Sequence, residues 1–327
     1  MNSFLKRELS RGNKVASLLL AALLLATQPV AATGQESGKG STLPSTKNTG
    51  PARLNNYRSL VSSPAVIEDS KRSEGAFAHA RYLVKNYSRE IRSGTLGANA
   101  STEDSTNRWY SREGHAAAHI GSIAYPLATV ADKQSWAIDK WMTDPIQRLQ
   151  LLGPQPRLVG YGEYCENGVC VAVLTTSISF VSWIEQMKQR ARPLAFDKLS
   201  RSPIKFPPNR ATVALRELSS DRNSALAACP EYKAPTRLPI TLQFPGMIDT
   251  NLSAYSVTKN GKPIQACGFG ATSYTNGDPK MQNDVRSLLK AYGAVVIIPR
   301  EPLLPGATYA ISAKVNGRRF AWSFKVK

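Results

Sequence analysis

The sequence is poor in the side chains that bind transition metals or act as nucleophiles. Its 327 residues include three histidines (His79, His115 and His119) and four cysteines. It has no Gly-x-Ser-x-Gly turn of the kind that carries the serine of many hydrolases. The Gly38–Thr42 segment lacks the spacing and the preceding strand of a phosphate-binding loop. We therefore expect a protein that needs no cofactor, and we favour a non-catalytic protein over an enzyme.

Acidic residues are also scarce. The chain carries 42 Lys and Arg but only 23 Asp and Glu, a formal charge of +19. Such a charge favours anionic surfaces, and for an exported protein these are the glycans or lipids of the cell envelope. The basic residues are scattered, so a solvated basic surface is the alternative. The sequence contains no nucleic-acid recognition motif, and we expect no nucleic-acid partner.

No apolar run reaches the length of about 20 residues that a membrane span needs. The N-terminal run, Val15 to Ala26, follows four basic residues and precedes the small residues of Val30-Ala31-Ala32. This order predicts a signal peptide over residues 1–32 and a secreted or periplasmic protein, with no other transmembrane segment. An uncleaved N-terminal anchor is the alternative. Removal of residues 1–32 takes away four basic residues and Glu8, which leaves a formal charge of about +16.

Four cysteines in an oxidising compartment suggest two disulfides. Between Cys165 and Cys170, Asn167-Gly168 is typical of a two-residue hairpin turn. Such a turn places the two cysteines opposite each other at a non-hydrogen-bonded position, where a disulfide fits. Cys229 and Cys267 would then form the second bridge.

Composition and periodicity divide the rest of the chain into four segments. Residues 33–56 are rich in Gly, Ser, Thr and Pro, which predicts a disordered linker. Residues 57–180 predict helices packed on a small sheet, an α+β sandwich. The helices are expected near Ala76–Asn86, Arg112–Ser122 and Ser135–Met142, with a short turn over Gln147–Leu152.

The C-terminal part follows a second linker, residues 181–205, which has helical character around Trp183–Arg190. From residue 206 to 327, short strands are separated by turns such as Asn260-Gly261 and Asn316-Gly317. One helix is expected over Lys280–Tyr292. This pattern predicts a β-sandwich of immunoglobulin-like (Ig-like) type.

Several short pieces between Ala76 and Leu174 resemble, in order and spacing, the bacterial branch of the CAP (SCP/PR-1-like) family. They are Ala76–Asn86, Tyr110–Ala117, Trp141–Arg148, Leu151–Pro154 and Val159–Gly162. The resemblance implies an α-β-α sandwich over residues 57–180. The C-terminal end, Pro299–Tyr309 followed by Trp322-Ser323-Phe324, resembles bacterial Ig-like modules.

The chain departs from the CAP pattern at its cavity positions. Ser101 stands where a histidine precedes an acidic pair in family members, and Gln147 replaces the histidine of the Pro-x-His-Arg motif, next to Arg148. The family's cavity glutamate has no counterpart between Gly114 and Asp139. Serine and glutamine are poor zinc ligands, so we expect the metal site implied by the family to be lost.

The remaining binding candidates are Glu103, His115 and His119. The two histidines are four residues apart on one helical face, the spacing of a two-histidine metal pair, which leaves zinc as an alternative. His79 is expected to pack or to form hydrogen bonds.

The leading hypothesis is an exported, non-catalytic protein that binds at the cell envelope or in the extracellular space. One alternative is a hydrolase acting on peptide or envelope polymer through Glu103 with His115 or His119. The other is lipid or sterol binding in the groove that the CAP resemblance implies.

Overall fold

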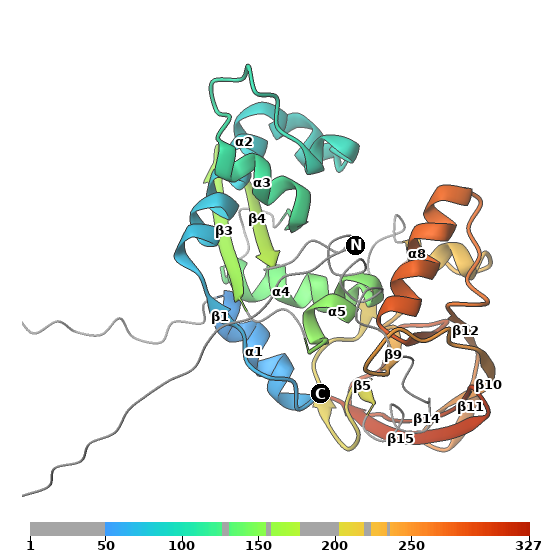
Figure 1. Ribbon diagram of the computed structural model, residues 1–327. Coiled ribbons are helices and arrows are strands. Elements are labelled where there is room, and N and C mark those ends of the chain that lie inside the picture. Colours follow the sequence, from blue (N-terminus) through green and yellow to red (C-terminus); the bar gives the residue numbers. More distant parts are fainter. Residues whose placement is uncertain (1–49, 126–130, 155–157, 177–202, 219–223, 234–235) are drawn as a thin grey trace, which may run out of the picture. The chain divides into compact units, whose positions relative to one another are not determined.

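The computed structural model describes residues 50–125, 131–154, 158–176, 203–218, 224–233 and 236–327 (Figure 1). These residues belong to one compact unit. The expected signal peptide, residues 33–49 of the first linker and residues 181–202 of the second linker, with its helical stretch, lie outside the described residues. Mixed α and β structure, the coarse prediction from the sequence, is confirmed.

The N-terminal part is built on a four-stranded sheet in the order β1-β3-β4-β2, in which β1 and β3 are parallel and the other neighbours antiparallel. Its strands are β1 (Ile67–Glu68), β2 (Gly121–Ala124), β3 (Leu158–Glu166) and β4 (Val169–Thr176). Its helices are α1 (Gly50–Leu60), α2 (Ser70–Ser93), the 3₁₀ turn η1 (Gly97–Ser101), α3 (Arg112–Ile120), α4 (Lys133–Thr143) and α5 (Pro145–Leu152).

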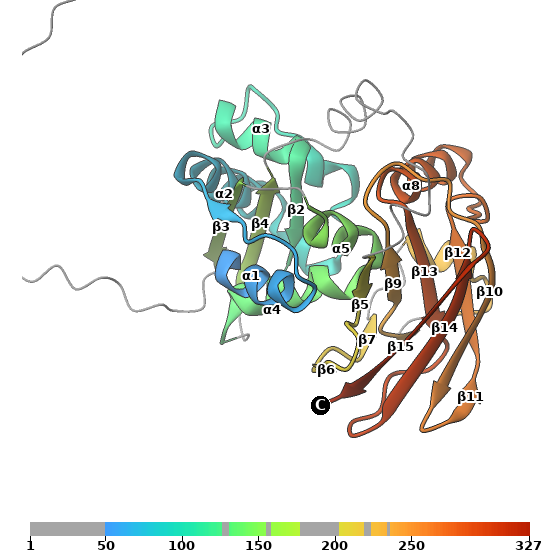
Figure 2. The same cartoon turned by 60° about the horizontal axis from the view of Figure 1, so that its bottom comes forward.

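Helices cover both faces of this sheet. Figure 2 shows α2 and α3 on one side of β3 and β4, and α1 and α4 on the other. Val171 and Val173 of β4 share a core cluster with Ala80 of α2. The alternate residue Leu174 belongs to a second cluster, with Ile138 of α4. Alternate side chains of β4 therefore point to opposite faces of the sheet and contribute to two separate core clusters.

Two glycines of β3 let α2 lie directly on the sheet. A Cβ at Gly160 would stand 2.2 Å from the backbone carbon of Arg72, and one at Gly162 would stand 2.1 Å from the backbone nitrogen of Phe77. Neither position leaves room for a side chain. Tyr161 between them donates its backbone N–H to the Ser73 hydroxyl of α2 at 3.0 Å.

Local capping explains where the helices begin. Asp69, Ser111, Asp132 and Asp144 each accept a hydrogen bond from a backbone N–H of the helix that follows. Ser111 accepts from the backbone N–H of Gly114, and Glu113 lies in the first turn of α3, where an acidic side chain is favourable. α2 ends at Gly94, whose φ of 68° is a left-handed conformation that suits glycine.

The C-terminal part contains two larger sheets and one short strand pair. The five-stranded sheet has the order β11-β10-β14-β15-β6, the four-stranded sheet β12-β13-β9-β5, and β7 pairs with β8. The bounds are β5 (Ile204–Phe206), β6 (Thr212–Val213), β7 (Glu217–Leu218), η2 (Ser224–Ala228), β8 (Thr236–Arg237), β9 (Ile240–Gln243), β10 (Leu252–Lys259), β11 (Lys262–Ile264), β12 (Ala266–Gly270), α8 (Pro279–Ala291), β13 (Ala294–Pro299), β14 (Thr308–Val315) and β15 (Arg318–Val326).

Alternating side chains of β13 contribute to two cores here as well. Val295 and Ile297 share a core cluster with Ile311 of β14, in the other large sheet. Val296 and Ile298 share a cluster with Leu289 of α8. The helix expected over Lys280–Tyr292 is therefore confirmed within one residue, and it packs on a sheet that is buried on both faces.

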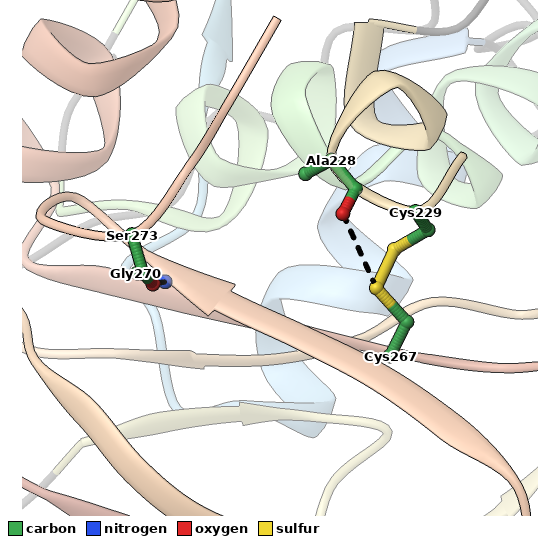
Figure 3. Close-up of a disulfide and its surroundings, with 5 residues drawn as sticks. All are labelled: Ala228, Cys229, Cys267, Gly270 and Ser273. Atoms are coloured by element: carbon green, nitrogen blue, oxygen red, sulfur yellow. Dashed lines mark hydrogen bonds between the residues drawn. A yellow bond between two sulfur atoms is a disulfide. The ribbon is translucent and has the colours of Figure 1, made fainter. Parts of the chain in front are cut away.

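Both predicted disulfides are present. Cys165 and Cys170 face each other across the β3–β4 hairpin with Cα atoms 4.1 Å apart, and Asn167 and Gly168 both have the positive φ that its turn requires. Cys229, which directly follows η2, is bonded to Cys267 of β12 (Figure 3). Sγ of Cys267 lies 3.5 Å from the Ala228 carbonyl oxygen, a contact without a shared proton because a disulfide sulfur carries none.

Three expectations about local structure are wrong. Residues 50–56, expected in the first linker, belong to α1, where Leu54 is fully buried. Residues 204 and 205, expected in the second linker, belong to β5, which pairs with β9. The expected turn over Gln147–Leu152 is helix α5, because Asp144 caps it and Pro145 occupies its first turn.

Candidate functional site

The first of the predicted site residues, Glu103, lies in the interior. Its side chain and that of His79 on α2 are both fully buried. Glu103 Oε1 is 2.8 Å from His79 Nδ1, and Oε2 accepts a hydrogen bond from the Ser111 backbone N–H at 3.2 Å. A Cβ at Gly114 would stand 2.6 Å from the carboxylate, so α3 packs closely against it. A polymer substrate has no access to this carboxylate.

The hydrogen-bond partners of His79 determine how protons are arranged in this pair. His79 Nε2 lies 2.9 Å from the Ala100 carbonyl oxygen, which can only accept, so Nε2 carries a proton. One further proton then lies between Nδ1 and the Glu103 carboxyl group. The pair is neutral overall, and each of its ring nitrogens and carboxyl oxygens has a hydrogen-bond partner. It therefore suits a structural role in which it links α2 to the start of α3. The expectation that His79 forms hydrogen bonds is confirmed.

His115 and His119 lie together on α3, as their spacing predicts. Their Nε2 atoms are 3.1 Å apart, with ring planes at 90°, and the ring of Tyr110 lies 5.8 Å from that of His115. No hydrogen bond within the described residues joins either histidine to Glu103. Among those same residues, no cluster of three or more His, Cys, Asp and Glu side chains is placed to hold a metal ion.

The other predicted positions are spread over separate elements. Ser101 is exposed in η1, whereas Gln147 lies on α5 with its Oε1 buried and without a described hydrogen-bond partner. Arg148 is fully buried and donates to the carbonyl oxygens of Met142, at 2.7 Å, and Pro239. Its guanidinium also lies 4.4 Å from the ring centre of Phe206. Burial lowers the pKa of Arg148 to about 9, which leaves it charged at neutral pH.

A surface that the sequence analysis missed surrounds Trp109. Three cations approach its ring: Arg81 at 5.5 Å, Lys85 at 4.7 Å and Arg108 at 4.8 Å from the ring centre. Phe77 and Tyr164 lie beside them with their rings edge to face at 5.8 Å. We call these six residues the Trp109 surface.

Three elements supply this surface. Phe77, Arg81 and Lys85 are spaced by four along α2 and share one of its faces. Arg108 and Trp109 come from the loop before α3, where the Trp109 backbone N–H donates to Asn107 Oδ1 at 2.9 Å. Tyr164 comes from β3. Phe77 is 42% exposed, unusual for a phenylalanine, and Arg108 is also exposed.

The charges of the Trp109 surface are only partly neutralised. Lys85 pairs with Glu166, and the hydrogen bond from this carboxylate raises the pKa of Lys85. Arg81 and Arg108 have no carboxylate partner among the described residues, and Nε of Arg81 is buried without a hydrogen-bond partner. Two guanidinium groups are therefore available to an anion, beside the exposed ring of Phe77 and the half-buried rings of Trp109 and Tyr164.

No protein-family model matches the chain, and a search of curated proteins finds no match. A functional hypothesis must therefore come from the Trp109 surface and from the positions of the predicted site residues. No helix among the described residues combines the length and apolar character that crossing a membrane would take. The two disulfides are compatible with an extracellular protein.

Part of the Trp109 surface has a signal in the sequence. An exposed aromatic residue followed at four-residue intervals by two cations, Phe77, Arg81 and Lys85, is an unusual face for a helix that also carries an apolar stripe. The contribution of Trp109 and Tyr164 has no such signal. They lie far along the chain from α2, and only the tertiary structure brings them to it.

Proposed function

We propose that this protein is exported and binds an anionic polysaccharide of the cell envelope through the Trp109 surface, without catalysis. The observation that carries the proposal is a pair of guanidinium groups without carboxylate partners among the described residues, Arg81 and Arg108, at 5.5 and 4.8 Å from the ring centre of Trp109. Guanidinium groups pair bidentately with carboxylate, sulfate or phosphate groups. Aromatic rings provide flat apolar faces that suit the C–H faces of sugar rings.

Electrostatics over the whole chain favours the same class of partner. The formal charge of about +16 that remains after removal of residues 1–32 attracts polyanions and speeds their encounter, and the Trp109 surface would then bind them. A phospholipid headgroup shares the anionic chemistry but has no sugar faces to stack on three rings. For this reason we favour a glycan over a lipid surface.

The predicted architecture supports a binding role. A CAP-like part without its metal ligands, at Ser101 and Gln147, followed by an Ig-like part would be a scaffold that presents a surface. In this interpretation residues 1–32 direct export, and the two disulfides form after it. The arrangement α-β-α in the N-terminal part, with Gly160 and Gly162 in close contact with α2, is compatible with the CAP resemblance.

The geometry favours binding over the hydrolase alternative. A general acid or base must come within hydrogen-bond reach of the bond that it cleaves, whereas Glu103 is buried and already hydrogen-bonded to His79 and Ser111. His119 is exposed and His115 is half-buried, but they contact each other rather than a carboxylate.

The test compares the mature chain, residues 33–327, with two double variants of equal charge change. Arg81→Gln with Arg108→Gln removes both free guanidinium groups. Lys262→Gln with Arg319→Gln removes two exposed cations of the C-terminal part and serves as the control. The probe is polygalacturonate, with dextran as the neutral polymer, and binding is measured by surface plasmon resonance at 0.05 and 0.5 M NaCl.

The first variant should bind polygalacturonate roughly tenfold more weakly, because two exposed ionic contacts contribute about 1.4 kcal/mol together. The control should remain within about twofold of the unmodified chain. Trp109→Ala should weaken binding at both salt concentrations, because stacking is not screened by salt. Equal losses in the two double variants would show only a general charge effect, and binding to anionic vesicles but not to the polysaccharide would favour a lipid partner.

A further inference from the structure

A pocket separate from the Trp109 surface lies beside α4. It has a volume of about 480 Å³, within the usual range of about 300–1,000 Å³ for sites that hold small molecules. It is lined by Trp136 and Lys140 of α4, by the segment around Leu215 and Arg216, and by Leu303. None of the predicted site residues lines it.

Lys140 is a partly buried cation without a carboxylate partner among the described residues. Its Nζ lies 4.8 Å from the ring centre of Trp136 and 5.6 Å from that of Tyr125. Burial lowers its pKa, as expected for an ammonium group that has lost part of its hydration. An anion in the pocket would give the Lys140 ammonium group a hydrogen-bonding partner in place of the water that it has lost.

The neighbouring carboxylate does not provide that anion. Asp139 accepts hydrogen bonds from Arg53 Nε and Nη2 at 2.8 and 2.9 Å, and from the hydroxyl of Tyr57 at 2.7 Å. Its charge is therefore neutralised by Arg53. Lys140 is left as an uncompensated charge one residue away.

The remaining charges of the pocket determine the charge of the ligand. Arg216 and Glu217 both line it, are exposed and have no ion-pair partner among the described residues. With Asp139 neutralised by Arg53, these two charges cancel, and Lys140 leaves an excess of one positive charge. A single carboxylate matches this balance, whereas a phosphate dianion would exceed it by one negative charge.

We propose that this pocket binds a small monocarboxylate with an apolar body, its carboxylate paired with Lys140 and its hydrocarbon part against Trp136 and Leu303. The apolar wall is continued by Leu215 and Pro302. Apolar surface supplies most of the affinity of such sites, and a few polar groups orient the ligand. This site is independent of the polysaccharide surface and goes beyond the proposed function.

The experiment uses the mature chain and the probe 4-phenylbutanoate, with its uncharged amide as the paired ligand. Binding is measured by a ligand-detected NMR titration. Twelve heavy atoms at the usual efficiency of drug-sized ligands correspond to a Kd on the order of 1 mM. The acid should bind at least tenfold more tightly than the amide. Equal affinities, or no binding of the acid up to tens of millimolar, would overturn the proposal.

Variants locate the site. Lys140→Met keeps the length of the side chain and removes its charge, and should weaken binding of the acid at least tenfold without affecting the amide. Lys133→Met, a lysine of the same helix that does not line the pocket, should bind as the unmodified chain does. Equal binding by the two variants would refute the assignment.

Two further variants keep the test decisive. Lys140→Arg preserves the charge and should retain binding of the acid within about threefold. If Lys140→Met fails to fold by circular dichroism, a normal affinity for the acid in Lys140→Gln would count against the pocket, and a loss would support it. The Arg81→Gln, Arg108→Gln double variant should bind the acid normally, so failure at one site can be told from failure at the other.

Discussion

Substitution of Gly162 by alanine should show how strongly the fold depends on close contact between β3 and α2. A Cβ at this position would lie 2.1 Å from the Phe77 nitrogen and 2.5 Å from the Ala76 carbonyl carbon, both backbone atoms of α2. Ordinary contacts of a Cβ are 3.4 Å or more. The helix would therefore have to retreat from the sheet by about 1 Å, because backbone cannot rotate away as a side chain can.

The cost follows from what α2 buries. Retreat of the helix would loosen the cluster that Ala80 and Leu83 form with the valines of β4. Overpacking of a core costs about 1–3 kcal/mol, and a clash with backbone belongs at the upper end, about 3 kcal/mol. For a domain of this size each kcal/mol lowers Tm by about 2–4 °C, so the expected fall is roughly 6–12 °C.

The assay is thermal unfolding of the mature chain followed by circular dichroism, with Gly277→Ala as the control. A Cβ at Gly277 meets nothing within 4 Å, so this variant should unfold within about 2 °C of the unmodified chain. Gly162→Ala should also bind polygalacturonate more weakly, because α2 carries Phe77, Arg81 and Lys85. A Tm within 1 °C of the unmodified chain would refute the reasoning, since α2 could not then lie as close to β3 as described.

Two further predictions concern the buried pair and the disulfides. Glu103→Ala should lower the free energy of unfolding, measured in urea, by about 2–3 kcal/mol, because His79 Nδ1 and the Ser111 N–H lose their buried acceptor. Glu74→Ala, at an exposed position on α2, should lower it by less than about 0.5 kcal/mol. Similar losses in the two variants would contradict the structural role of the His79–Glu103 pair. Cys229→Ala with Cys267→Ala should cost about 4 kcal/mol, and Cys165→Ala with Cys170→Ala about 2 kcal/mol, because the bridges close loops of 38 and 5 residues. Calorimetry of both variants would measure the difference, and an equal loss would argue against the loop-entropy explanation.

Much of the local structure could be predicted because local chemistry determines it. The Asn167-Gly168 turn requires positive φ at both residues, which sets the register of β3 and β4 and brings Cys165 opposite Cys170. The Ser111 cap and the alternating residues of β14 and β15 were predictable for the same reason. The N-terminal limit of the fold was not, because Gly50–Asn56 has a linker-like composition and becomes helical through the burial of Leu54.

The sequence by itself determined the basic charge, the scarcity of metal ligands and the adjacency of His115 and His119, because these depend on composition or on one helical turn. Only the tertiary structure decided that Glu103 is buried against His79 and that Trp109 and Tyr164 join three cations of α2 and its neighbouring loop. It also decided that Lys140 lines a pocket without a counter-charge. Each of these depends on contacts between residues distant in sequence, which burial of the apolar faces of helices and strands brings about and which no local pattern records.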